Sequence, residues 1–184
     1  MNTPPRSTHC HICDVCVLRR DHHCMFSGGC VGHANQRYFF SLLVALVIGA
    51  VYCNYLNMDY TLELLGGVSF SSMLTVVLPL LAWSVGLAGR ETFVISLIAS
   101  TCLVGLFLFA AMLAYHTRNV LRAQTCVEVA RGVRDYDRGW RANLEAVFGA
   151  RWYVAWVTPL VPSALPGNGV EFERKYRYEN IKDI

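Results

Sequence analysis

The stretch that decides the fold is HCHICDVCVLRRDHHCMFSGGC, residues 9–30, which is followed closely by the apolar stretch RYFFSLLVALVIGAVYCNYL, residues 37–56. The first stretch contains five cysteines and four histidines, and these are residue types that bind zinc in proteins. The second is long and apolar enough to form a membrane helix. Together they predict a metal-binding domain joined directly to a membrane region.

The composition of the whole chain supports a membrane protein. Of the 184 residues, 54% are hydrophobic and only 16% are charged, whereas soluble domains contain about 25% charged residues. The net charge of +3 is too small to indicate a nucleic-acid partner. A nucleic-acid-binding zinc module is further disfavoured because the cysteine cluster is tethered to the membrane segment.

Three apolar runs follow the cluster, at residues 38–58, 68–88 and 93–115. Arginines flank the start of the first run and the end of the last, and such flanks lie on the cytosolic side of a membrane. Two crossings satisfy this condition and three do not. The middle run contains Pro79 and a Gly/Ser-rich opening, so we expect it to be re-entrant, interfacial or packed against the others. A third crossing is the alternative.

The expected fold class is therefore a mainly α membrane protein with transmembrane helices and a small cytosolic zinc-binding domain. Residues 1–37 are expected to form this Cys/His-rich domain of loops and short β-hairpins. Residues 38–115 form the membrane region, with spans at 38–58 and 93–115 separated by a polar break that begins at Met58. Residues 116–184 form a cytosolic C-terminal region.

The spacing within residues 9–30 indicates zinc but leaves one thiol open. Cys10, Cys13 and Cys16 recur at steps of three, and Cys-x2-Cys is a common zinc-binding turn. Two zinc sites need eight ligands, and the nine cysteines and histidines fall short of that number once Cys24 and one histidine are set aside for catalysis. Cys24 is either one more ligand or a nucleophile, because Asp21 and His22 precede it in the order of a carboxylate–imidazole–thiol triad.

A family resemblance bears on this choice. The segment PPRSTHCHICDVCVLRRDHHCMFSGGCVGHANQRYFF, residues 4–40, closely resembles the cysteine-rich domain of the DHHC protein S-acyltransferases, integral membrane enzymes that transfer palmitate from palmitoyl-CoA to protein cysteines. The resemblance implies that Cys24 is the nucleophile, His22 its base and Asp21 the orienting acid. It also implies one zinc site made by Cys10, Cys13, His23 and Cys30, and half of a second site made by His9 and Cys16.

The sequence departs from the family pattern in two places that matter. Family members carry a further Cys-x2-Cys and two membrane spans before the residue that matches His9, so we expect this chain to be the C-terminal part of a family member with an incomplete second zinc site. The family's Thr-Thr-x-Glu motif appears as Thr125-Cys126-Val127-Glu128. Its second Thr supports the catalytic Asp, so Cys126 is expected either to weaken that contact or to be a surface residue without a role.

The function implied by the resemblance is protein S-palmitoylation through an acyl-Cys24 intermediate. The implied partners are palmitoyl-CoA, substrate proteins with membrane-proximal cysteines, and the lipid bilayer. We expect Arg19 and Arg20 to contact the CoA phosphates, with exposed solubilising charges as the alternative. The expected location is a Golgi or endoplasmic-reticulum membrane, multi-pass, with the active site facing the cytosol. The competing hypothesis is a catalytically inactive, truncated zinc-binding membrane scaffold.

Overall fold

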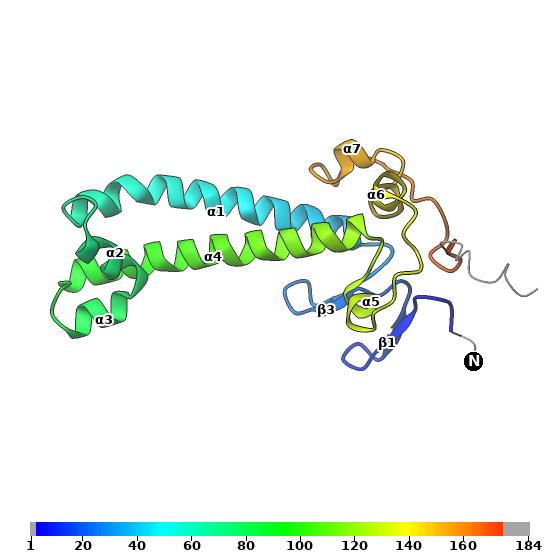
Figure 1. Ribbon diagram of the computed structural model, residues 1–184, viewed down its shortest axis with the longest axis horizontal. Coiled ribbons are helices and arrows are strands. Elements are labelled where there is room, and N and C mark those ends of the chain that lie inside the picture. Colours follow the sequence, from blue (N-terminus) through cyan, green and yellow to red (C-terminus); the bar gives the residue numbers. More distant parts are fainter. Residues whose placement is uncertain (1–2, 175–184) are drawn as a thin grey trace, which may run out of the picture. The chain divides into compact units, whose positions relative to one another are not determined.

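The computed structural model describes residues 3–174 and is mostly helical (Figure 1). Two hairpins come first, followed by two long helices and several short ones. The strands are β1 Thr8–Cys10, β2 Val15–Val17, β3 His22–Cys24 and β4 Gly29–Val31, and the helices are α1 Gln36–Leu64, α2 Phe70–Val77, α3 Pro79–Ser84, α4 Arg90–Leu121, α5 Cys126–Ala130, α6 Trp140–Phe148 and α7 Trp152–Ala155. The chain divides into two compact units, one formed by residues 1–42 with 114–184 and the other by residues 43–113.

The predicted short β-hairpins are confirmed. Strand β1 pairs with β2 and strand β3 pairs with β4, each in antiparallel register. The turn of the second hairpin contains Gly28 at a φ of +65°, a conformation that glycine adopts without strain. The two hairpins approach each other at Gly32, where an added Cβ would lie 2.8 Å from the Leu18 carbonyl oxygen and 2.8 Å from a methyl carbon of Val17. This close approach therefore requires glycine.

Within the described residues, two helices are long and apolar enough to cross a membrane, α1 with 29 residues and α4 with 32. Both extend beyond the predicted ranges of 38–58 and 93–115. Helix α1 continues to Leu64 through the polar break that begins at Met58, because this segment contains residues of good helix propensity such as leucine and glutamate. The boundary of the membrane span within α1 stays a prediction. The helix ends before Gly66 and Gly67, whose φ angles are +72° and +96°.

Residues 65–89 connect the two long helices within the second unit. Helix α2 has 8 residues and α3 has 6, lengths of about 12 Å and 9 Å at 1.5 Å per residue, against about 30 Å for a bilayer core. Pro79 begins α3 at its first position, where its missing N–H costs no hydrogen bond. Neither helix can span a bilayer alone, and the membrane placement of residues 68–88 stays a prediction.

Helix α6 contacts several other segments of the first unit. The Arg19 guanidinium donates a hydrogen bond of 2.9 Å to the Ala146 carbonyl in α6, and the rings of Phe40 and Phe148 meet edge to face at 5.1 Å. Asn143 is fully buried and donates to the Leu121 carbonyl at 2.8 Å. The segment between the hairpins, the start of α1 and the end of α4 therefore all contact α6.

A buried ion pair ties the start of the chain to α5. Arg6 makes a bidentate contact with the two carboxylate oxygens of Glu128, at 2.6 Å and 2.7 Å, and also donates to the Ala123 carbonyl at 2.8 Å. The side chains are only 4% and 8% exposed. Glu128 also accepts from the Thr125 N–H while the Thr125 hydroxyl accepts from the Glu128 N–H, which is a capping box.

Breaking this ion pair is expected to destabilise the first unit strongly. Glu128→Gln keeps an oxygen for the Thr125 N–H but leaves the Arg6 charge buried and unpaired, a change that costs about 3–5 kcal/mol of unfolding free energy. The matched control is Glu173→Gln, which removes the partner of Arg138 from a pair 38% and 79% exposed and costs about 0–1 kcal/mol. Denaturant unfolding in detergent, followed by tryptophan fluorescence, measures both, and equal losses would contradict the prediction.

Candidate active site and metal centre

The alternation of side chains along β3 separates two clusters. Successive residues of a strand point to opposite faces, so His22 and Cys24 share one face while His23 points to the other. The register reinforces this division, because His23 lies opposite Cys30 and Cys24 lies opposite Gly29. Three consecutive residues can therefore serve two different sites.

The His23 face carries a set of metal-type ligands. The Nδ1 atom of His23 lies 3.6 Å, 3.3 Å and 3.8 Å from the sulfurs of Cys10, Cys13 and Cys30. All four donor atoms lie within 4.8 Å of one another. Ligands that surround zinc tetrahedrally at about 2.0–2.3 Å are roughly 3.3–3.8 Å apart. The structure thus brings together the four residues that the resemblance assigned to one zinc site, and their donor atoms can hold one zinc ion.

His9 and Cys16 lie opposite each other in the first hairpin. The Cys16 sulfur is 3.6 Å from the His9 Nδ1 atom, and both residues are exposed. The Asp14 carboxylate is 3.6 Å from the other nitrogen of the same ring. The structure pairs the two residues that the resemblance assigned to half of a second zinc site.

The Asp21 carboxylate, immediately before β3, is the centre of a hydrogen-bonded cluster that includes His22. It is 1% exposed, and one of its oxygens lies 2.7 Å from His22 Nδ1. Burial alone raises the pKa of Asp21, but hydrogen bonds from His22 and Cys126 outweigh it, so the pKa is lowered below its ordinary value. The carboxylate is therefore ionised at neutral pH and can orient the imidazole.

His22 in turn acts on the Cys24 thiol. Burial opposes the charged imidazole, but the hydrogen bond and charge of Asp21 raise the pKa of His22 above its usual value. Burial likewise opposes the Cys24 thiolate, but hydrogen bonds from Ser27 and His22 lower the pKa of Cys24. The two shifts favour an imidazolium beside a thiolate, the form in which cysteine is a nucleophile.

Cys126 does contact the acid. Its backbone N–H donates to one Asp21 oxygen at 2.9 Å and its thiol donates to the other at 3.0 Å. Burial and the charge of Asp21 raise the pKa of Cys126 to about 12, so the thiol keeps the proton that it donates. Cys126 is thus half-buried against Asp21, so the alternative of a surface cysteine was wrong, and a weakened support of Asp21 stays a prediction.

His116 is a residue of the site that the sequence did not reveal. Its Nδ1 atom, carried by α4, lies 3.7 Å from an Asp21 oxygen, and its ring centre lies 5.5 Å from that of His22. Phe39 approaches both imidazoles edge-on, with ring centres at 4.7 Å and 4.9 Å. A lone histidine at the end of an apolar run gives no spacing signal, so only the fold identifies it.

The two arginines expected to contact CoA occupy different environments. Arg20 is half-buried and donates to the His9 carbonyl at 3.2 Å. Arg19 is 1% exposed, so the alternative of a solvent-exposed solubilising charge was wrong for this residue. Burial, together with the charge of Arg6, lowers the pKa of Arg19 to about 10, and the guanidinium remains charged at neutral pH.

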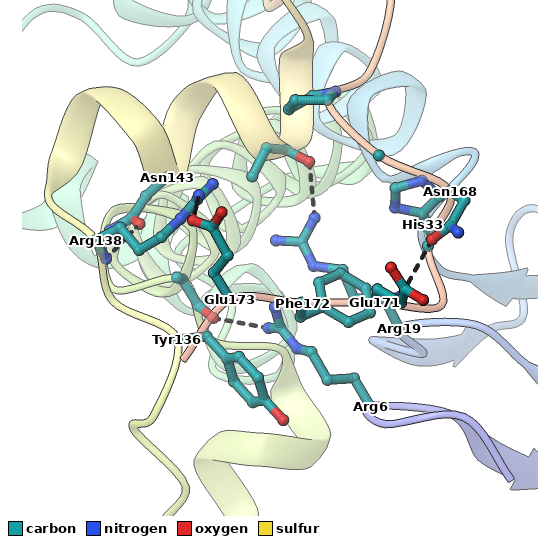
Figure 2. Close-up of a pocket in the computed structure, with 15 residues that line it drawn as sticks. Arg6, Arg19, His33, Tyr136, Arg138, Asn143, Asn168, Glu171, Phe172 and Glu173 are labelled. Atoms are coloured by element: carbon teal, nitrogen blue, oxygen red, sulfur yellow. Dashed lines mark hydrogen bonds and ion pairs between the residues drawn. The ribbon is translucent and has the colours of Figure 1, made fainter. Parts of the chain in front are cut away.

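Arg19 faces a cavity of about 460 Å³ (Figure 2). Arg6, His33 and Arg138 also line the cavity, and Glu171 and Glu173 partly offset their positive charge. Within residues 3–174, the Nε atom of Arg19 has no hydrogen-bond partner. This cavity is therefore a place where an anionic group can meet an arginine that is buried and only partly satisfied.

Comparisons with known proteins agree with the motif. The family model described as DHHC palmitoyltransferase matches residues 1–132. The chain is 40% identical over 173 residues to a rat protein named Probable palmitoyltransferase ZDHHC24, covering 92% of this chain and 60% of that protein.

Two further relatives come from other species. The zebrafish (Danio rerio) protein of the same name is 42% identical over 173 residues, with 94% of this chain and 59% of that protein covered. A human protein named Palmitoyltransferase ZDHHC22 is 34% identical over 164 residues, with 85% and 61% covered. The chain thus spans about three-fifths of the length of these curated relatives.

The geometry on the His23 face predicts the zinc content of variants. Cys30→Ala removes one of four donors, so the purified protein is expected to lose one zinc ion per chain and part of its folding free energy, because structural zinc sites stabilise the fold directly. Cys53→Ala, a change at an exposed cysteine of α1, is the matched control. Elemental analysis measures the metal, and equal zinc in both variants would contradict the assignment.

Proposed function

Because the chain belongs to the DHHC palmitoyltransferase family, we propose that it acts as a protein S-palmitoyltransferase with a covalent acyl intermediate on Cys24. The observation that carries the proposal is the 2.7 Å hydrogen bond between Asp21 and His22, next to a thiol whose pKa is lowered. A carboxylate that holds an imidazole beside a thiol is the arrangement that nucleophilic cysteine catalysis needs.

In the first half-reaction, the Cys24 thiolate attacks the thioester carbonyl of palmitoyl-CoA. A new carbon–sulfur bond forms to Cys24, the bond to the CoA sulfur breaks, and CoA leaves as the thiolate. His22 holds the proton that came from Cys24 and transfers it to the departing CoA sulfur. The ionised Asp21 stabilises the imidazolium until this proton has been transferred.

In the second half-reaction, the sulfur of a substrate cysteine attacks the acyl carbonyl on Cys24. His22, neutral after the first half-reaction, takes the proton of the substrate thiol as that sulfur attacks. The acyl group moves to the substrate sulfur, its bond to Cys24 breaks, and Cys24 leaves as a thiolate beside the His22 imidazolium. The two steps are chemically symmetrical thioester exchanges, so one base and one orienting acid suffice for both. Substrate cysteines close to the membrane surface are expected, since the nucleophile lies only a short segment before α1.

The metal ligands have a structural part in this proposal. Cys10, Cys13, His23 and Cys30 are proposed to hold one zinc ion, which supplies cross-links between the two hairpins and no reaction chemistry. His9 and Cys16 are proposed to contribute two ligands to a second zinc ion. His23 then keeps the backbone of β3 fixed while its neighbours His22 and Cys24 take part in the reaction.

The proposal places helices α1 and α4 across a bilayer, with their arginine-flanked ends in the cytosol. Palmitoyl-CoA has an acyl chain that favours lipid and a polyanionic head that favours water, so its thioester resides at the interface. Phosphates of the head group are proposed to contact Arg20 at the surface and Arg19 through the cavity that it lines. Location in the Golgi or endoplasmic reticulum stays a prediction from the resemblance.

Labelling with a palmitoyl-CoA analogue tests the proposed nucleophile. Wild type is expected to acquire a label that hydroxylamine removes, as a thioester requires, and Cys24→Ser is expected to lose it. Cys53→Ser is the matched control and should retain the label. Equal labelling of the Cys24→Ser variant and wild type would reject Cys24 as the acyl carrier, and absence of label from all three would favour the non-catalytic scaffold.

The role of His22 has its own kinetic test. His22→Ala is expected to slow single-turnover acyl transfer to Cys24 by about 10²-fold or more, because positioned proton transfer contributes about 10²–10⁴-fold. His11→Ala, at an exposed histidine of the same segment, should leave the rate near that of wild type. Rapid-quench measurement with the same analogue gives both rates, and a His22→Ala rate within a few-fold of wild type would contradict the role.

A further inference from the structure

Four side chains around the Asp21 carboxylate form a second group of metal-type ligands. Asp21, His22, His116 and Cys126 each offer one donor atom, and these four atoms lie within 4.8 Å of one another. Asp21 immediately precedes β3 and His22 begins it, whereas His116 lies in α4 and Cys126 begins α5. The group shares no residue with the Cys10, Cys13, His23 and Cys30 set.

The donors suit a zinc ion in both chemistry and spacing. Two imidazole nitrogens, a carboxylate oxygen and a thiolate sulfur are all common zinc ligands. One Asp21 oxygen lies 2.7 Å from His22 Nδ1, 3.7 Å from His116 Nδ1 and 3.0 Å from the Cys126 sulfur. Tetrahedral zinc needs separations of roughly 3.3–3.8 Å, so movements of less than about 1 Å convert the hydrogen-bonded cluster into a coordination shell.

The burial of the four residues allows an ion to enter and leave. Asp21 and His116 are buried, whereas His22 and Cys126 are half-buried. The donor that distinguishes this chain is Cys126, which stands where the family pattern has threonine. A threonine hydroxyl is a much poorer zinc ligand than a thiolate, so the fourth strong donor exists because of this one substitution.

We propose that Asp21, His22, His116 and Cys126 bind a zinc ion reversibly, and that this ion inhibits acyl transfer. Binding releases the Cys126 thiol proton and the proton on His22 Nδ1 to water, since a coordinating thiol and a coordinating imidazole nitrogen are both deprotonated. It also replaces the hydrogen bond between Asp21 and His22 Nδ1 with two bonds to the metal. His22 is then no longer oriented by a free carboxylate. The inhibitory part rests on the proposed function, and the binding part does not.

Cobalt(II) titration of the full chain in detergent tests the binding. Wild type that retains its tightly bound zinc is expected to take up one further cobalt ion with thiolate-to-cobalt absorption. Cys126→Ser should lose that absorption and bind the further ion roughly tenfold or more weakly. His116→Gln should weaken binding of the further ion by a similar factor, since even changes beside a metal ligand cost about 10–100-fold in affinity. Cys53→Ser is the matched control. Identical absorption and affinity in Cys126→Ser and wild type would overturn the site.

Added zinc tests the inhibition. The rate of Cys24 acylation, normalised to the zinc-free rate of each variant, is expected to fall at least tenfold more in wild type than in Cys126→Thr, and a chelator should restore it. If wild type binds the further cobalt ion but added zinc leaves its rate of Cys24 acylation unchanged, the proposed inhibition is wrong and the metal site still stands. If no variant becomes acylated, the proposed function fails, while the cobalt titration still decides whether the site exists.

Discussion

The buried ion pair between Arg6 and Glu128 is the constraint on which the arrangement of the site depends. Helix α5 has only five residues, too few to be stable alone. Its position is set by the bidentate contact of Glu128 with Arg6 and by the capping box with Thr125. The residue after that cap is Cys126, whose N–H and thiol both reach Asp21. An ion pair between distant parts of the chain therefore positions the donors that orient the acid.

A second constraint is the two-residue period of β3. A helix would spread His22, His23 and Cys24 around its axis at about 100° per residue, whereas a strand sends alternate residues to opposite faces. Only the strand brings His22 and Cys24 together while His23 joins the cysteines. The same period places Cys30 beside His23 across the hairpin. The order of residues in this short motif is thus explained by the geometry of a strand that serves two sites.

The sequence predicted the local features and missed those that depend on distant contacts. The spacing of Cys10 and Cys13 and the family pattern were enough to group the ligands that the structure brings together, and the family assignment is confirmed. The contact of Cys126 with Asp21 spans 105 positions, and His116 carries no motif of its own. Burial of Arg19 follows from packing against α6. The longer α1 reflects ordinary helix propensity in a segment whose polar residues suggested a break.

The register of the second hairpin links the metal ligands to the reactive thiol although they share no atom. A slip of one residue in a strand moves every side chain to the opposite face, and the β3–β4 hairpin has only three residues in each strand to resist it. His23 and Cys30 face each other across that hairpin, so an ion held by both fixes the register. Fixing the register keeps Cys24 on the same face of β3 as His22, whose ring nitrogen contacts Asp21. In the proposed mechanism, loss of zinc from this set would therefore slow the reaction by releasing the strand, although the ion itself would take no part in the chemistry.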